Sequence, residues 1–225
     1  MSAKTTTATT PGKKRILLVD DHGIVREGIA ELVNGHNEFQ ICGSVATAGE
    51  AMDAVAKLKP DLVVADLSLE GGSGLDLIKN LKALYPLLKV LVLSMHDESL
   101  YAERALRAGA LGYVMKRAES ATVLQAIRTV LEGQVFLSPA MRDRMLQKVV
   151  GNTVQPDATG MAHLSDREME VFQFIGQGRT TRQIAKQLHI SVSTVETHRG
   201  HLKEKLNLAN STELMRRAVE WVSTH

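Results

Sequence analysis

Four short apolar runs, each ending in polar side chains, constrain the fold of this chain more than any other feature of its sequence. Such runs, rich in β-branched residues, are typical of strands buried on both faces of a parallel sheet. The runs and the side chains that end them are 16–19 with Asp20 and Asp21, 62–65 with Asp66, 90–93 with Ser94, and 111–115 with Lys116. Because ligands bind beyond the carboxyl ends of parallel strands, we expect these polar groups to meet at one edge, with Asp66 at its centre.

Helical patterns alternate with the apolar runs up to residue 132. We predict strands at 15–19, 39–44, 61–66, 90–93 and 111–115, and helices at 22–33, 48–58, 75–84, 98–107 and 118–131. This alternation predicts an α/β doubly wound domain with a five-stranded parallel sheet, flavodoxin-like in its strand order 2-1-3-4-5. In that order Asp20 and Asp21 lie beside Asp66.

The stretch 71–74 is predicted to be a loop. The apolar stripe of the helix at 75–84 is predicted to be Leu75, Ile78, Leu81 and Leu84.

Residues beyond the α/β pattern show helices only, and these begin with capping signals. A Ser, Thr or Asn precedes a Glu or Gln by three residues at Ser165 and Glu168, Thr180 and Gln183, and Asn210 and Glu213. Another helix is predicted from about Ser191 to Leu206, after a tight connection at 188–191. Two short helices, a tight turn and a longer polar helix are typical of a helix-turn-helix, so we predict a small all-α DNA-binding domain.

Length and composition indicate the organisation of the chain and its setting. The 225 residues are enough for two domains, and 44% hydrophobic residues with a net charge of +2 are ordinary for a globular protein. Cys42 is the one cysteine, and no signal peptide or bilayer-spanning stretch is recognised, so we expect a cytoplasmic protein without a membrane partner. The predicted organisation is a disordered tail at 1–14, the α/β domain at 15–134, a linker with a short helix at 135–162, and the helical domain at 163–225.

Three carboxylates at one edge of the sheet predict a metal-assisted phosphoryl site. Asp20, Asp21 and Asp66 would repel one another unless a cation compensates them, and Mg²⁺ suits such carboxylates together with a phosphate oxygen. Asp66 can then act as the nucleophile and form an aspartyl phosphate, with Lys116 and the Ser94 hydroxyl binding the phosphoryl oxygens. Singly, each residue is better interpreted as a helix cap, a turn or a strand end. Together they favour the site, because four strands would otherwise end in complementary groups by chance.

The exposed face of the helix that begins near Ser191 favours DNA binding. The second helix of a helix-turn-helix enters the major groove, where Glu196 can accept a hydrogen bond from cytosine and Thr197 can contact a thymine methyl group. Gly200 costs about 1 kcal/mol relative to alanine in a helix interior, which is explained if the backbone approaches DNA closely. The alternative is a solvated helix of an interaction domain, with His198 on its core side. The candidate DNA-contacting residues are Arg179, Thr180, Arg182, Ser193, Thr194, Glu196, Thr197, Arg199 and Lys203.

These motifs, in this order and at this spacing, resemble a known family of bacterial proteins. Residues 15–132 resemble the receiver domain of response regulators, and residues 163–222 resemble the LuxR-type helix-turn-helix domain. Together they resemble the NarL/FixJ subfamily of two-component transcription factors. The resemblance implies that Asp66 accepts a phosphoryl group from a partner histidine kinase, and that Asp20, Asp21, Asp66 and the backbone carbonyl of Ser68 hold Mg²⁺.

The resemblance also assigns roles outside the acidic cluster. It implies that Ser94 and Tyr113 are the switch residues and that Lys116 binds the phosphoryl group. It places Ser68 and His96 at positions that affect the lifetime of the phosphoryl group. The helix at 210–221 resembles the family's dimerisation helix, which implies a homodimer on activation or on DNA, with candidate residues Leu214, Ala218 and Trp221. The chain departs from the family at Glu70 and Arg117, where proline is common.

We therefore expect a transcriptional regulator, not an enzyme, that binds double-stranded DNA and is switched by phosphorylation of Asp66. Phosphorylation should draw in Ser94 and Tyr113 and remodel the surface formed by 98–107, 111–115 and 118–131. One alternative is a regulator of the same fold that protein partners control without phosphorylation. A less favoured alternative is a phosphatase that works through an aspartyl phosphate. Such enzymes usually carry a second aspartate two residues after the nucleophile, where this chain has Ser68.

Overall fold

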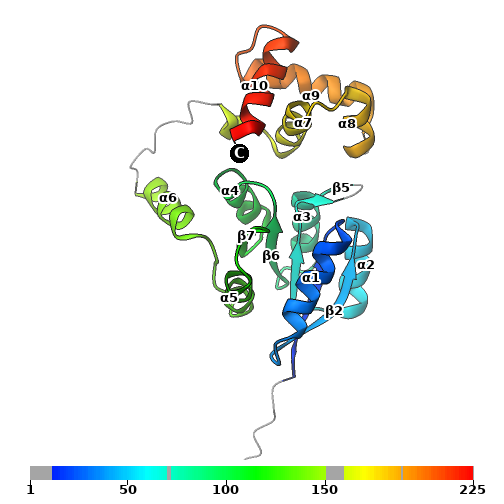
Figure 1. The fold of residues 1–225 in the computed structure, drawn as a ribbon, viewed down its shortest axis with the longest axis vertical. Coiled ribbons are helices and arrows are strands. Elements are labelled where there is room, and N and C mark those ends of the chain that lie inside the picture. The colour runs from blue at the N-terminus through cyan, green and yellow to red at the C-terminus, as the bar shows by residue number, and fades with distance from the viewer. Residues whose placement is uncertain (1–11, 70–71, 151–159, 189, 225) are drawn as a thin grey trace, which may run out of the picture.

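The apolar runs form the five-stranded parallel sheet that their composition predicts. The computed structural model describes residues 12–69, 72–150, 160–188 and 190–224. The strands of the sheet are β1 Lys14–Val19, β2 Phe39–Val45, β3 Leu62–Ala65, β6 Lys89–Ser94 and β7 Gly112–Met115. Their order is β2-β1-β3-β6-β7, which confirms the predicted order with β1 beside β3 (Figure 1). Val19 lies opposite Ala65 in this pairing, so both strands end at the same level.

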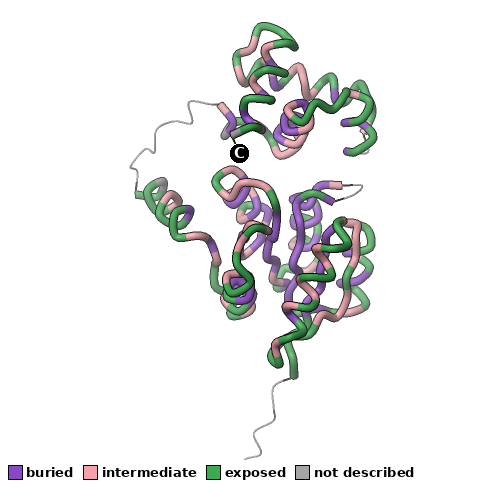
Figure 2. The backbone as a smooth tube through the Cα atoms, in the orientation of Figure 1, coloured by how far each residue is buried: buried purple, intermediate pink, exposed green. Residues whose placement is uncertain are grey.

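Helices cover both faces of the sheet, because successive side chains of a strand point to opposite sides. Leu17 packs with α2 Ala48–Leu58, α3 Gly74–Leu84 and α4 Glu98–Ala108, whereas Ile16 and Leu18 pack with α1 Gly23–Asn34 and α5 Ser120–Leu131. The buried positions in Figure 2 follow this arrangement along the strands and the inward sides of the helices. Together β1 to α5 form the α/β domain.

The apolar stripe predicted for α3 is wrong at its last residue. Leu75, Ile78 and Leu81 are buried, but Leu84 is 65% exposed. A helix turns by about 100° per residue, so a strict three-residue spacing drifts by about 60° at each step. By the fourth residue the stripe has drifted to the opposite side of the helix, which faces solvent.

The predicted loop at 71–74 is partly a small hairpin that supports the carboxyl edge. β4 Ser68–Leu69 pairs antiparallel with β5 Gly72–Ser73, and Gly74 is the first residue of α3. A Cβ atom on Gly74 would lie 2.2 Å from the carbonyl oxygen of Asp66. Only glycine therefore lets α3 begin directly beneath the segment that carries Asp66. Glu70 and Gly71 lie outside the described residues.

The C-terminal part of the chain is helical, as predicted. Its elements are α6 Pro139–Val149, η1 Met161–His163, α7 Asp166–Gly176, α8 Thr181–Leu188, α9 Val192–Lys205 and α10 Ser211–Thr224. Ser165 and Glu168 form the predicted capping box of α7, and the Ser191 side chain accepts a hydrogen bond from the backbone of Thr194 at the start of α9. We refer to η1 through α10 as the helical domain. His189, in the predicted tight connection, lies outside the described residues.

The predicted tail and linker are only partly described. Residues 1–11 and 151–159 lie outside the described part of the chain, while Lys14 belongs to β1 and not to the tail. At the start of the predicted linker, Phe136 forms a bridge with Gly112 at the edge of the sheet. Within the ranges that the structure describes, no helix has the length and apolar character needed to cross a membrane.

Candidate functional site

The ends of β1 and β3 bring the three predicted carboxylates together. Asp20 is 6% exposed and Asp66 is 3% exposed, while Asp21 is half-buried. Ligand atoms of Asp20, Asp21, His22 and Asp66 all lie within 4.8 Å of one another. The cluster follows from the strand pairing, because two parallel strands that end at the same level place their next residues side by side.

Lys116 provides a buried positive charge for this cluster. Its Nζ lies 2.6 Å from Oδ2 of Asp20 and 2.7 Å from Oδ2 of Asp66, and its side chain is 5% exposed. Burial alone would lower the pKa of Lys116, but the hydrogen bonds to Asp20 and Asp66 outweigh it and raise the pKa above its ordinary value. The ammonium group therefore stays charged between the two acids. The backbone of Lys116 is fixed as well, because its N–H donates to the Ser94 carbonyl at 2.8 Å.

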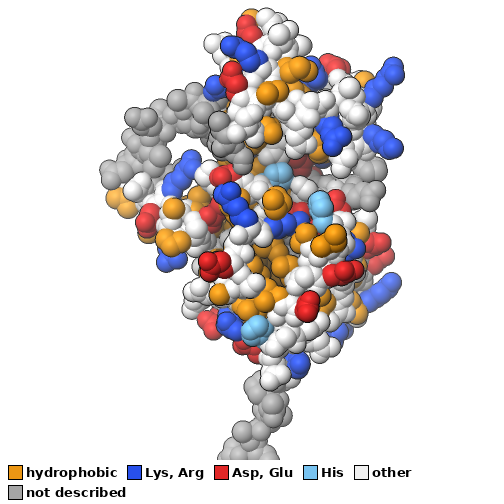
Figure 3. Space-filling model, in the orientation of Figure 1, with side chains coloured by type: hydrophobic (Ala, Val, Ile, Leu, Met, Phe, Trp, Pro, Cys, Tyr) orange, Lys and Arg blue, Asp and Glu red, His pale blue; other side chains and the backbone are white. Residues whose placement is uncertain are grey.

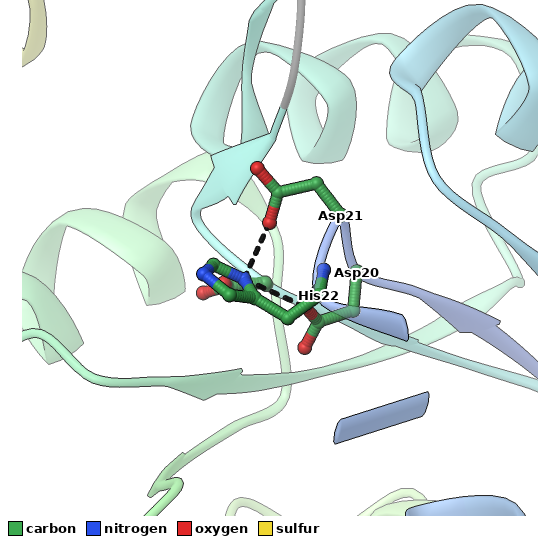
Figure 4. A group of neighbouring side chains, drawn as sticks. Asp20, Asp21 and His22 are labelled. Carbon is green, nitrogen blue, oxygen red and sulfur yellow. Dashed lines mark hydrogen bonds and ion pairs between the residues drawn. The ribbon is translucent and has the colours of Figure 1, made fainter. Parts of the chain in front are cut away.

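His22 is a member of the cluster that our sequence prediction missed. Its Nδ1 lies 2.6 Å from Oδ1 of Asp21 and 3.3 Å from Oδ1 of Asp20 (Figure 4). Burial raises the pKa of Asp21, and the negative charges of Asp66 and Asp20 add to this effect, while His22 opposes it. The position of His22 directly after two acids was the signal that could have revealed it.

The donor set of the cluster fits a hard divalent cation. Three carboxylates face one buried ammonium, so the charges leave an excess of two negative charges when His22 is neutral. Carboxylate oxygens are the ligands that Mg²⁺ prefers, and a divalent ion would cancel this excess. Asp20, Asp21 and Asp66 are therefore suited to hold such an ion.

Ser94 and Tyr113 are both buried beside the cluster. Ser94 is 0% exposed, and the Tyr113 hydroxyl donates a hydrogen bond of 2.8 Å to the backbone carbonyl of His96. Burial raises the pKa of the Tyr113 hydroxyl well above its ordinary value, so it remains a donor. Tyr113 is only 1% exposed, so its ring already lies inside. The role of Tyr113 as a switch residue remains a prediction.

The helical domain docks on the same edge of the sheet. A cavity between the two domains is lined by Asp21, Ser68 and His96 on one side and by Glu170 and Gln173 of α7 on the other. Burial raises the pKa of Glu170 in this position. We did not predict this docking from the sequence, because no local sequence pattern indicates that α7 contacts the carboxyl edge of the sheet.

An ionic contact holds the first turn of α7. Asp166 lies 2.9 Å from Nζ of Lys79 on α3 and 2.9 Å from a guanidinium nitrogen of Arg104 on α4. Burial would raise the pKa of Asp166, but these two partners outweigh it and lower the pKa. The carboxylate is thus kept ionised between two cations of the α/β domain.

The candidate DNA-contacting residues lie on the surface of the helical domain. Arg179, Thr180 and Arg182 are exposed, and Lys and Arg side chains project over the region of α8 (Figure 3). Glu196 is exposed but accepts a hydrogen bond of 2.9 Å from Thr181. The remaining candidates on α9 are Ser193, Thr194 and Thr197, which are exposed, and Arg199 and Lys203, which are half-buried.

Gly200 faces open space, whereas His198 is partly covered. A Cβ atom added to Gly200 would meet no described atom within 4 Å, so packing within the domain does not explain the glycine. His198 is half-buried, with Nδ1 of its ring shielded from solvent. Within the described part of the chain, however, its buried Nδ1 makes no hydrogen bond. Burial lowers the pKa of His198.

The residues predicted for dimerisation belong to the core of their own domain. Leu214 and Ala218 are 0% exposed, and Trp221 is 9% exposed, with its ring 5.8 Å from that of Phe172. These side chains are thus covered by α7 and cannot form a surface for a second copy. The exposed apolar side chains of α10 are Met215 and Val219, at 47% and 44%. Dimerisation through α10 remains a prediction, and those two residues replace the three that we named.

Two family models match two separate parts of the chain. The response regulator receiver domain matches residues 16–128, and the bacterial regulatory proteins of the luxR family match residues 162–218. The oxygen regulatory protein NreC of Staphylococcus carnosus is 35% identical over 92% of this chain and 97% of its own length. These matches are to regulators and not to enzymes.

Solved structures of response regulators share the fold of this chain over part or nearly all of its length. A LuxR-family two-component response regulator from Aurantimonas sp. SI85-9A1 is 36% identical, with a TM-score of 0.57 over 61% of this chain and 99% of that chain. RcsB of Salmonella enterica serovar Typhimurium, bound to the promoter rprA in the presence of the phosphomimetic BeF₃⁻, has a TM-score of 0.67 at 23% identity. That match covers 92% of this chain and 98% of RcsB and shows the shared fold.

Proposed function

This chain belongs to the response regulators that join a receiver domain to a LuxR-type DNA-binding domain, and on this basis we propose that phosphorylation of Asp66 switches its binding to double-stranded DNA. The observation that carries the proposal is the buried Asp66 carboxylate, which shares the Lys116 ammonium with Asp20 at the carboxyl edge of the sheet. We propose that the receiver domain begins with Lys14 of β1 and the DNA-binding domain with Met161 of η1, one and two residues before the predicted limits of 15–134 and 163–225.

The geometry supports Asp66 as the phosphoacceptor. Its Oδ1 accepts a hydrogen bond from the backbone of Leu67 at 2.6 Å, and its Oδ2 pairs with Lys116, so the carboxylate is held in one orientation. In the proposed transfer, an Asp66 oxygen bonds to phosphorus while the bond from phosphorus to a histidine of the kinase breaks, and the histidine nitrogen keeps the electron pair. Lys116 then compensates charge on the phosphoryl oxygens.

The other acids prepare the site for this chemistry. We propose that Asp20, Asp21, Asp66 and the backbone carbonyl of Ser68 hold Mg²⁺, which when bound would neutralise charge on the incoming phosphoryl group. We propose that the Ser94 hydroxyl, at the end of the neighbouring strand β6, donates to a phosphoryl oxygen. This role would connect the phosphoryl group to Tyr113 and to the backbone of His96.

The partners that we propose follow from the two domains. A histidine kinase in the cytoplasm would supply the phosphoryl group, and the helical domain would bind DNA through α9, with basic residues of α8 at phosphates. A homodimer that forms on activation or on DNA would read two half-sites. The exposed Met215 and Val219 of α10 are the residues that we propose for its contact.

The proposed function can be tested with a phosphoryl mimic. Purified protein would be titrated with BeF₃⁻ and Mg²⁺, with molar mass followed by light scattering and DNA binding followed by selection from genomic fragments. We expect saturable BeF₃⁻ binding, tighter DNA binding and a shift from monomer to dimer, all absent in Asp66→Asn. DNA binding that is unchanged while BeF₃⁻ demonstrably binds would contradict the switch and favour control by protein partners.

A further inference from the structure

His96 is the residue at which the carboxyl edge of the sheet and the helical domain meet. Its ring Nε2 lies 2.8 Å from the hydroxyl of Ser68, and its ring Nδ1 lies 3.2 Å from Nε2 of Gln173 on α7. The ring also stacks on Tyr101, with a centroid distance of 4.7 Å and an interplanar angle of 25°. One imidazole thus connects a neighbour of Asp66 with the domain that binds DNA.

The backbone of His96 contacts both residues of the proposed switch. Its N–H donates to the Ser94 hydroxyl at 3.4 Å, and its carbonyl accepts from the Tyr113 hydroxyl at 2.8 Å. The long first contact is the weaker of the two. A change of partner at Ser94 or Tyr113 therefore acts directly on the segment that carries the His96 ring.

The chemistry of the groups fixes the direction of the hydrogen bonds. The amide nitrogen of Gln173 can only donate, so Nδ1 of His96 accepts and the ring proton lies on Nε2, from which it is donated to Ser68. This arrangement requires a neutral imidazole. Gln173 is 8% exposed, so water replaces a lost partner poorly and the contact with His96 matters to the docked arrangement.

We propose that His96, through its hydrogen bond to Gln173, couples the state of the Asp66 site to the docking of the helical domain. The inference rests on the proposed function, because it takes a phosphoryl group on Asp66 as the signal. When Ser94 turns toward that group, the backbone contacts of His96 change, the ring leaves Gln173, and α7 separates from the α/β domain. His96 is a positioning residue in this scheme and takes no part in phosphoryl transfer.

The coupling must work in both directions. If a phosphoryl mimic opposes docking, docking opposes binding of the mimic by the same factor. Breaking the bond between His96 and Gln173 should therefore open the molecule without any mimic and make the mimic bind more tightly. Couplings between sites commonly amount to about 5- to 150-fold in affinity, and we expect about fivefold from this one contact.

The experiment uses full-length Gln173→Ala, His96→Ala and the double variant. Domain separation is measured by small-angle X-ray scattering, and the affinity for BeF₃⁻ with Mg²⁺ is measured by titration. The matched control is Gln177→Ala, the same change one turn further along at a side chain that lines the same cavity. Thermal unfolding checks that each variant is folded, and Gln173→Ala favours a helix.

We expect the Gln173→Ala and His96→Ala proteins to be more extended than wild type and to bind BeF₃⁻ about fivefold more tightly. The double variant should show no further gain, because both changes remove one contact, and Gln177→Ala should behave as wild type. Suppose that wild type opens with BeF₃⁻, but that Gln173→Ala has the same shape as wild type without the mimic and binds the mimic with the same affinity. The coupling is then overturned, and the proposed function stands. If wild type binds no BeF₃⁻, the proposed function fails first and this inference with it.

Discussion

At the scale of single residues, the carboxyl edge of the sheet is dominated by the balance of buried charge. Asp20 and Asp66 share the ammonium group of Lys116, and all three side chains are less than a tenth exposed. Removing one partner of a buried ion pair leaves the other charge desolvated, which typically costs about 3–5 kcal/mol. Lys116 therefore stabilises the fold in addition to the role that we propose for it in phosphoryl binding.

We predict that Lys116→Met lowers the free energy of unfolding by about 3 kcal/mol in EDTA, because two buried carboxylates lose their counter-charge. Addition of Mg²⁺ should restore part of this stability, since the ion replaces the missing positive charge. Urea unfolding with and without Mg²⁺ measures both effects. The control is Lys57→Met at an exposed position of α2, where we expect a change within about 0.5 kcal/mol. Equal stability of wild type and Lys116→Met in EDTA would contradict the charge balance.

Gly200 allows a second prediction, which separates helix stability from DNA contact. Gly200→Ala should raise the free energy of unfolding by up to about 1 kcal/mol, because alanine suits a helix and its Cβ meets open space. The same change should weaken DNA binding, since the added methyl group keeps the backbone of α9 away from the groove. Fluorescence anisotropy with a bound DNA fragment and urea unfolding measure the two effects.

Gly28→Ala is the matched control for this prediction. Gly28 lies inside α1, and a Cβ atom there also meets no described atom within 4 Å. It should bring the same gain in stability with no effect on DNA binding. If Gly200→Ala bound DNA as tightly as wild type, close approach of DNA to this glycine would be ruled out.

At the scale of elements, α7 connects most of the molecule. Its first turn pairs with α3 and α4 through Asp166, its middle contacts His96 through Gln173, and its end packs closely on α10. At that end, a Cβ atom on Gly176 would lie 2.4 Å from the carbonyl oxygen of Ala218. A helix with so many partners needs a fixed start, which the capping box of Ser165 and Glu168 supplies.

We predict that Glu168→Gln destabilises the helical domain by about 1.5 kcal/mol at neutral pH. Glutamine can keep the capping box, but it loses the charged hydrogen bond of 2.7 Å from Lys205. Burial would raise the pKa of Glu168, yet its bonds to Lys205 and Ser165 lower it below the ordinary 4.5. Its stabilisation is therefore present above pH 4.5 and is lost as the pH falls through the lowered value.

The measurement is urea unfolding of wild type and Glu168→Gln over a descending series of pH values. The difference in stability between the two proteins should be constant above pH 4.5 and should shrink below it. A difference that grew on acidification would show that the pKa of Glu168 is raised in the folded protein, which would contradict the structure.

At the scale of the whole molecule, two kinds of contact dock the domains. The buried apolar cluster that packs on α4 continues into the helical domain, and Asp166 adds an ionic contact at its edge. Salt weakens only the second kind, since the screening length falls from about 10 Å at 0.1 M to about 3 Å at 1 M ionic strength. The two contributions can therefore be separated by experiment.

We predict that Asp166→Asn shifts the protein toward a more extended form, because Lys79 and Arg104 lose their common carboxylate. High salt should extend wild type in the same direction and should change the variant less. Small-angle X-ray scattering at low and high salt measures this. The control is Asp76→Asn, which removes the other carboxylate near Lys79 without touching the helical domain. An identical salt response of wild type and Asp166→Asn would show that the ionic contact does not hold the domains.

Sequence patterns determined much of the fold and the composition of the acidic cluster. The strands and their order could be predicted because buried parallel strands need continuous apolar runs. Since β1 and β3 are neighbours and end at the same level, the residues that follow them, Asp20 and Asp66, must lie close together. The helix starts at Ser165 and Ser191 were also predictable, because a capping side chain bonds to backbone atoms only three residues away.

Only the tertiary structure decided what covers each surface. The apolar stripe of Leu214, Ala218 and Trp221 has the same sequence pattern whether its own domain or a second copy covers it, and here α7 covers it. The bond between His96 and Gln173 joins residues 77 positions apart, and that between Arg104 and Asp166 joins residues 62 positions apart. No local periodicity encodes such pairs, because their partners belong to different domains and meet only where the domains dock.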